Sequence, residues 1–140
     1  MINYNVVKRN ISTGFNPGEK YLAVIDRSGI MTQEQLADRI SEMSSLAYND
    51  VLSALAALQM VIADATMNGI TVQLDQLGNF TPFIKSTAVD AIEDANVESI
   101  KRLRVNFYPN VRFKKKLKSS GFVFKYPVPK GLVDPPVVTP

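Results

Sequence analysis

Alternating apolar and polar positions open the chain and predict strands. Residues 2–9 begin by alternating apolar side chains with asparagines, a period of two that is typical of a strand with one buried face. Residues 10–20 contain Gly, Asn and Pro and predict a loop. Residues 21–25 are again apolar, so we expect a second strand there.

The pattern then changes to a helical period. Thr32 and Gln35 have the spacing of a capping box, in which each side chain bonds the other residue's backbone N–H group, so a helix is expected to begin at Thr32. Residues 48–68 predict the longest helix, with apolar side chains on more than one face. Gly69 follows it and suits the left-handed conformation that ends many helices. Because few residues separate the two helices, we expect them to form a hairpin.

Further alternation predicts a sheet after the helices. Strands are expected over residues 70–74, 80–85 and 103–107. Pro82 favours a sheet edge or a bulge, because proline has no N–H group to give to the ladder. Asn110 is a candidate N-cap for a short, lysine-rich helix. The fold class is therefore α+β.

The C-terminal end has its own composition. Residues 121–126 are rich in aromatic side chains and predict a last strand, and five of the eight prolines lie from Pro127 onward. Proline-rich segments favour extended backbone. We therefore divide the chain into an N-terminal β extension over 1–31, a main domain over 32–118 and a Pro-rich tail over 119–140.

The absent residue types limit the chemistry. The chain of 140 residues contains neither Cys nor His, so the usual zinc, copper and haem sites and the Ser-His and Cys-His nucleophile pairs cannot be built. It also contains no glycine-rich phosphate loop and no calcium-binding loop. We therefore expect no enzymatic activity, no cofactor, no metal and no small-molecule substrate.

The sequence also bears on location. It has no run of eighteen apolar residues and no basic, apolar start, so neither a membrane span nor a secretory signal is expected. Without cysteine there is no disulfide framework, and cytoplasm is the default compartment.

Charge is unevenly distributed along the chain. Residues 1–100 carry six Lys and Arg against twelve Asp and Glu, a net charge of −6, whereas residues 101–140 carry ten against one, a net charge of +9. A segregated basic end is typical of a protein with a polyanionic partner, although a solvated helix face would look the same. The candidate DNA-binding residues are Lys101, Arg102, Arg104, Arg112, Lys114, Lys115, Lys116 and Lys118.

Three motifs give this order of elements a family resemblance. They are Leu36-Ala37-x-x-Ile40-Ser41, Gly69-x-x-Val72-x-Leu74-x-x-Leu77-Gly78-x-Phe80 and Arg104-Val105-x-Phe107-x-Pro109. Over about residues 32–118 the chain resembles the histone-like HU/IHF family of bacterial DNA-binding proteins, and its extended ends look like the variant set of Bacteroides-like bacteria. The second motif is the most specific, because residue type, order and spacing all agree.

The resemblance implies a fold, a partner and a place in the cell. It implies a helix hairpin, an antiparallel sheet with a β-arm and a short C-terminal helix, with extra strands at the N-terminus. Two chains would form a homodimer on their long helices, and the arms would embrace duplex DNA. Binding would rest on phosphate contacts with weak sequence specificity, as in a nucleoid-associated, DNA-condensing protein of the cytoplasm.

One segment departs from the family pattern. Residues 86–100, where the family has an Arg-rich arm, contain no Lys or Arg and four carboxylates: Asp90, Glu93, Asp94 and Glu98. Phosphate would repel these side chains. An alternative function therefore stays open, that of a structural or protein-interaction module that has kept the dimeric scaffold and lost DNA bending.

The phenylalanines also allow two interpretations. Phe80, Phe83, Phe107 and Phe113 could stack on bases, but the alternation of their strands turns most of them inward, which favours a place in the core.

Overall fold

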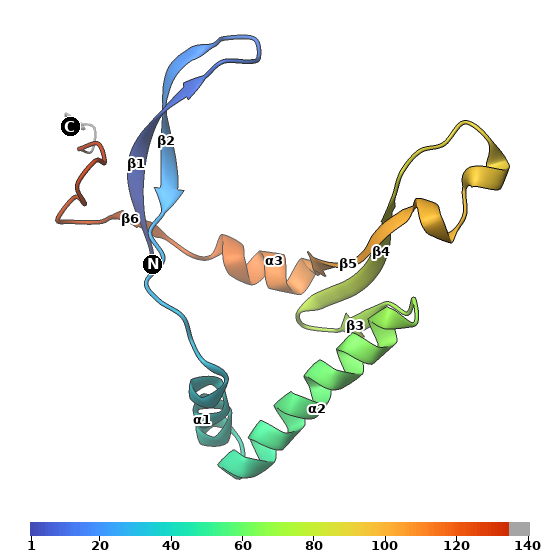
Figure 1. Cartoon of the computed structure of the whole chain (residues 1–140). Coiled ribbons are helices and arrows are strands. Elements are labelled where there is room, and N and C mark those ends of the chain that lie inside the picture. The colour runs from blue at the N-terminus through green and yellow to red at the C-terminus, as the bar shows by residue number, and fades with distance from the viewer. Residues whose placement is uncertain (135–140) are drawn as a thin grey trace. The chain divides into compact units, whose positions relative to one another are not determined.

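The computed structural model describes residues 1–134 and divides the chain into two compact units. One unit joins Met1–Ile30 to the residues from Ser119 onward, and the other is Met31–Lys118. The described residues form α-helices and two small sheets (Figure 1), the α+β class expected from the pattern. The sequence pattern predicts two separate extensions, 1–31 and 119–140, whereas the structure gathers the two ends into one unit.

A three-stranded sheet forms the first unit. β1 (Ile2–Ile11) pairs antiparallel with β2 (Gly18–Ile25) on one edge and parallel with β6 (Phe122–Phe124) on the other. Both N-terminal strands are longer than the sequence predicts, because their ladder continues to the tight turn at 12–17. β6 is shorter than the predicted segment 121–126.

Specific contacts hold the C-terminal segment to this sheet. The Lys125 ammonium lies 2.7 Å from the Asp26 carboxylate, and the Lys125 N–H donates to the Tyr4 carbonyl at 3.1 Å. The Phe124 and Tyr4 rings meet edge to face, with centroids 5.5 Å apart. Val133 forms an isolated bridge to Val6. The aromatic segment therefore packs on β1, and the rest of the predicted tail, 135–140, lies outside the described residues.

A helix hairpin begins the second unit. It consists of α1 (Gln33–Met43) and α2 (Tyr48–Met67). The capping box is confirmed, because the Thr32 N–H donates to Gln35 Oε1 at 3.0 Å and the Gln35 N–H to Thr32 Oγ1 at 3.3 Å. Ala37, buried on α1, and Val51, buried on α2, are the buried apolar residues of the described chain.

Glycine ends α2 as predicted. Gly69 adopts φ 77°, and the N–H groups of Gly69 and Ile70 donate back to the carbonyls of Thr66 and Ala65. This pair of bonds is the Schellman motif, which satisfies carbonyls that the last helical turn leaves open.

An antiparallel sheet follows, in the order β3-β4-β5 (Figure 1). Its strands are β3 (Val72–Leu74), β4 (Gly78–Ser86) and β5 (Ile100–Pro109). β3 pairs only with the start of β4, so Pro82 lies where β4 has a single neighbour, as its missing N–H group requires. β4 and β5 extend as a hairpin, hereafter the arm. Two 3-10 turns, η1 (Ile92–Asp94) and η2 (Val97–Ser99), form its end.

The short helix α3 (Val111–Lys118) follows β5 directly. Asn110 caps it as predicted, because the Phe113 N–H donates to Asn110 Oδ1 at 2.9 Å. The Asn110 side-chain amide also donates to the Asp75 carbonyl, and its backbone N–H donates to the Leu77 carbonyl at 3.0 Å. The cap thereby fixes the start of α3 to the β3–β4 turn.

α2 leaves most of its apolar side chains uncovered by its own chain. α2 carries apolar side chains on more than one face, yet only Val51 and Thr66 of it are buried. By length and composition α2 could cross a membrane, with a mean hydropathy of 1.4, although the sequence contains no unbroken run of eighteen apolar residues. Within residues 1–134, most of the apolar surface of α2 therefore remains uncovered.

Candidate nucleic-acid interface

The two faces of the arm differ in chemistry. On one face, three cross-strand pairs bring together Phe80 with Phe107, Pro82 with Val105, and Ile84 with Leu103. This face and α2 line an apolar groove of about 510 Å³. On the opposite face, hereafter the arm face, the pairs are Thr81 with Asn106, Phe83 with Arg104, and Lys85 with Arg102. Strand alternation therefore separates apolar residues from cations and hydrogen-bond donors.

Cations face one another on the arm face. Lys85 and Arg102 are direct cross-strand partners, and Arg104 lies two residues further along β5. All three are exposed, and none makes an ion pair within residues 1–134. Like charges placed opposite each other destabilise a strand pair. An anion bound between Lys85 and Arg102 would relieve that repulsion.

Two aromatic rings lie on the same face. The Phe83 and Tyr108 rings are 6.3 Å apart at 74°, and they remain 40% and 48% exposed. The Asn106 side-chain amide donates to the Tyr108 hydroxyl at 3.4 Å. The arm face therefore combines cations, amide and hydroxyl donors and apolar ring surface.

Phe80, Phe107 and Phe113 lie on the groove side of the sheet, although none of them is fully buried and Phe107 is 40% exposed. Phe107 lies 5.1 Å from Phe80 and 6.4 Å from Phe113, measured between ring centroids, in a cluster on the side of the groove. Phe83 is the exception, because β4 turns it to the arm face beside Arg104. For Phe83 the core interpretation is wrong.

The eight candidate DNA-binding residues divide into groups. Arg102 and Arg104 lie on the arm face, and Lys101 is the extra residue of a β-bulge, without a cross-strand partner. The remaining candidates are exposed residues of α3, hereafter the basic helix: Arg112, Lys114, Lys115, Lys116 and Lys118. Lys85 was missed, because it is an isolated cation in the acidic part of the sequence. Its position directly after Ile84, in an alternating strand, was the signal that it faces away from the groove.

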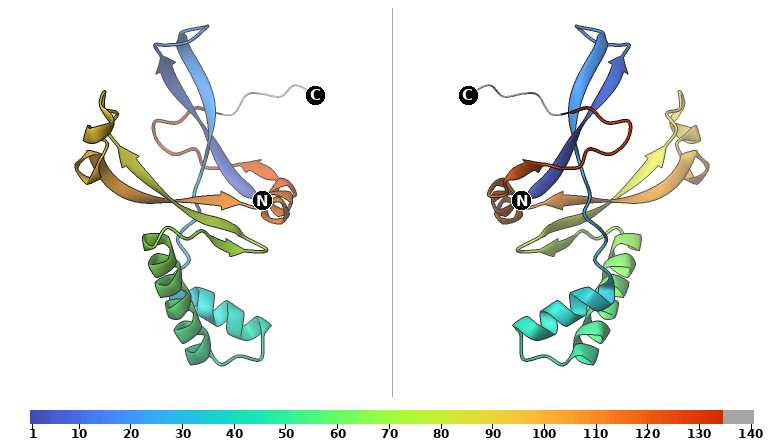
Figure 2. Two further views of the ribbon diagram at one scale, coloured as in Figure 1. Left: turned by 90° about the vertical axis from the view of Figure 1, so that its right-hand side faces the viewer. Right: turned by 90° about the vertical axis from the view of Figure 1, so that its left-hand side faces the viewer.

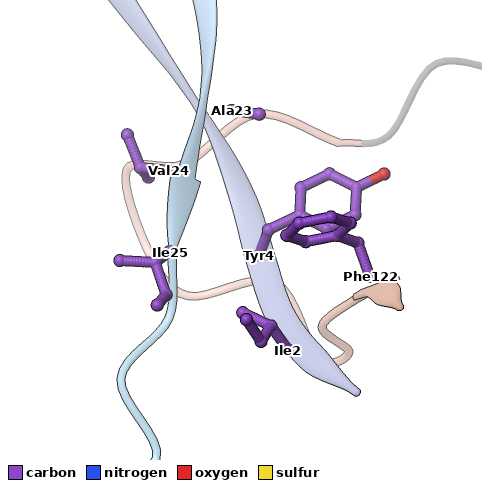
Figure 3. Close-up of a pocket in the computed structure, with 6 residues that line it drawn as sticks. All are labelled: Ile2, Tyr4, Ala23, Val24, Ile25 and Phe122. Atoms are coloured by element: carbon purple, nitrogen blue, oxygen red, sulfur yellow. The ribbon is translucent and has the colours of Figure 1, made fainter. Parts of the chain in front are cut away.

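Catalytic and metal-binding features do not accompany these cations. Among residues 1–134 no group of three or more His, Cys, Asp or Glu could hold a metal ion. A pocket of about 440 Å³ lies on the sheet of the first unit, and Figure 3 shows the side chains that line it: Ile2, Tyr4, Ala23, Val24, Ile25 and Phe122. It offers one hydroxyl and no carboxylate or amine, so it supplies no acid–base pair.

Comparison with known proteins assigns the family. The family model described as "HU domain fused to wHTH, Ig, or Glycine-rich motif" (HU-HIG) matches residues 1–123. The chain belongs to the HU-HIG family. This confirms the predicted histone-like resemblance, and the match includes β1 and β2 of the first unit.

One solved structure shares the fold of the HU-HIG chain. It is a protein of Bacteroides vulgatus ATCC 8482 described as a "putative bacterial DNA binding protein", with a TM-score of 0.63 and 13% sequence identity. The match covers 88% of this chain and 47% of that one, so the chain spans about half the length of that protein. No curated protein matches the HU-HIG chain.

Proposed function

We propose that this HU-HIG chain is a non-catalytic, dimeric, architectural protein that binds duplex DNA mainly through phosphate contacts. The proposal rests on the arm face, where Lys85, Arg102 and Arg104 are exposed and make no ion pair within residues 1–134. The family membership and the name of the structural neighbour support the same partner. Such a protein acts on the nucleoid, in the cytoplasm.

Phosphate recognition suits both groups of cations. A row of exposed Lys and Arg side chains neutralises phosphates and releases their counterions, a contribution that does not depend on sequence. The amide of Asn106 and the hydroxyl of Thr81, on the same face, add hydrogen-bond donors of the kind that position a protein on the backbone. Weak sequence specificity follows from this set of contacts.

A homodimer accounts for the surface that one chain leaves open. Most apolar side chains of α2 are not buried by their own chain, and obligate homodimers bury about 2,000–5,000 Å² of largely apolar surface. The apolar groove between α2 and the arm adjoins exposed apolar residues of the same helix, such as Met60 and Val61. A second copy of α2 offers the same apolar surface and would cover this region.

A membrane would be a poor alternative cover for α2. Gln59, near the middle of the helix, donates to the Gln33 side chain on α1 at 2.9 Å, and Asp64 lies one turn later. An amide bonded to a neighbouring polar helix and a carboxylate are costly in lipid. We therefore propose protein contact rather than lipid contact.

Fluorescence anisotropy with a labelled 30-base-pair duplex tests DNA binding at 50 and 200 mM salt. Binding should weaken steeply with salt. The double variant Arg102→Gln with Arg104→Gln removes four cations per dimer. It should flatten the slope of log K against log salt by about 3.6, if each cation neutralises one phosphate.

The matched control is Arg9→Gln with Arg27→Gln, which removes the same number of cations from the first unit and should leave the slope unchanged. Absence of binding at 50 mM salt would refute the proposal. Equal effects of the two double variants would refute the assignment to the arm face.

The acidic end of the arm favours a second candidate function, an interaction module that no longer bends DNA. Its four carboxylates lie where an embracing arm would meet phosphate. Energy transfer between dyes at the two ends of the duplex separates the candidates. A shortened end-to-end distance on binding supports the architectural role, and an unchanged distance supports the alternative.

A further inference from the structure

Exposed apolar residues mark the end of the arm, residues 87–99, hereafter the arm tip. Ile92 is 84% exposed and Val97 is 83% exposed. Each begins a 3-10 turn, and carboxylates follow it: Glu93 and Asp94 in η1, Glu98 in η2. Large apolar side chains presented this openly, with polar residues around them, are typical of an interaction site.

The basic helix offers the complementary chemistry. Val111 is 66% exposed at its first position. Lys114, Lys115 and Lys118 follow at the spacing i+3, i+4 and i+7, so they share the helix face of Val111. Residues 101–118 contain no carboxylate. Val111 and the lysines beside it are therefore complementary in chemistry to the arm tip, where carboxylates lie beside Ile92 and Val97.

The two surfaces lie at opposite ends of one strand. β5 leads from the arm tip to the start of the basic helix, as Figures 1 and 2 show. Its ten residues span about 33 Å at roughly 3.3 Å per residue. The arm tip therefore cannot fold back onto the basic helix of its own chain. Only another copy can bring the two surfaces together.

We propose that the arm tip is a docking surface for the basic helix of a second copy of this chain. Ile92 and Val97 pack against Val111, and the tip carboxylates pair with Lys114 and Lys115. The contact joins different surfaces, so it either closes into a ring or continues from copy to copy. It goes beyond the proposed function, and DNA and a neighbouring arm tip compete for the same lysines.

Sedimentation velocity on the full chain tests the contact at 20 and 500 mM salt. At 20 mM salt the wild type should form species larger than those at 500 mM. Glu93→Lys with Asp94→Lys places cations opposite Lys114 and Lys115 of the neighbouring copy, and Lys114→Glu with Lys115→Glu places carboxylates opposite Glu93 and Asp94. Each double variant alone should self-associate at least about tenfold more weakly.

Mixing the two double variants provides the sharper measurement. The two substituted lysines on the tip of one variant then face the two substituted glutamates on the helix of the other, so the larger species should return in the mixture. If the larger species do not return, although circular dichroism shows that both variants are folded, the proposal is overturned. The control Asp38→Lys with Glu42→Lys changes two exposed carboxylates of α1 and should leave association unchanged; a loss as large as that of the tip variant would also overturn it.

A separate double variant tests the contribution of the apolar side chains of the arm tip. Ile92→Ser with Val97→Ser keeps every charge and should weaken the association, whereas unchanged association would show that Ile92 and Val97 are not a docking surface. None of these measurements includes DNA, so failure of the proposed DNA binding would leave them informative. Conversely, a chain that binds duplex without forming larger species would refute only this inference.

Discussion

Replacing Lys85 by Glu should raise the stability of the fold and weaken DNA binding. Lys85 faces Arg102 across the β4–β5 ladder. Cross-strand charge pairs contribute about 0.2–1 kcal/mol, and the substitution turns a repulsive pair into an attractive one. The free energy of unfolding should therefore rise by about 0.5–2 kcal/mol per chain, with the lower end favoured because both side chains are exposed.

The same substitution removes a phosphate contact. A dimer loses two cations, so the slope of log K against log salt should flatten by about 1.8, and the new carboxylates repel phosphate in addition. Urea unfolding at fixed protein concentration measures the first effect, and duplex anisotropy measures the second.

Lys8→Glu is the matched control, because Lys8 is also an exposed strand lysine but lies 2.8 Å from the Glu19 carboxylate. That substitution should lower stability by a few tenths of a kcal/mol and leave DNA binding unchanged. If Lys85→Glu destabilises the fold, or if duplex binding is unaffected, the reasoning about the arm face is refuted.

Two further predictions concern the scaffold. Gly78→Ala would place Cβ against the Tyr108 carbonyl oxygen at φ 155° and should cost about 3 kcal/mol or more in urea unfolding. Gly69→Ala, at φ 77° with open space around its Cβ, should cost only about 1–2 kcal/mol; equal losses would exclude the clash as the cause. Val61→Asp on the exposed apolar surface of α2 should reduce the light-scattering mass to that of one chain at high salt, whereas Asn49→Asp on the same helix should not. A dimeric Val61→Asp variant would place the interface elsewhere.

The features that the sequence predicted best depend on neighbouring residues. The capping box at Thr32, the glycine end of α2 at Gly69 and the Asn110 cap each require residues within five positions, and each is present. The pairing of β6 with β1 joins segments more than a hundred residues apart. No local period encodes such a parallel contact, so the C-terminal segment was interpreted as a separate tail.

The candidate site was predicted in part for a related reason. Counting charges along the chain identified the cluster after residue 100, but the register of β4 against β5 decides which cations share a face. That register brings Lys85 to Arg102 and leaves Lys101 in a bulge. The sequence likewise could not predict that α2 is largely exposed, because apolar composition does not show whether a helix is covered by its own chain or by another.

The change of charge in the sequence, at residue 100, coincides with the start of β5. A helix of the same ten residues would separate its ends by about 15 Å, little more than the Debye length of about 10 Å at 0.1 M salt. The carboxylates of the arm tip would then partly neutralise the lysines beyond. An extended strand keeps the two groups about 30 Å apart, roughly three Debye lengths, so each retains its own field. A phosphate backbone is therefore attracted to the end of the arm that bears the basic helix and repelled from the tip. Phosphate contact should accordingly run from the basic helix along the arm face and stop short of residues 87–99.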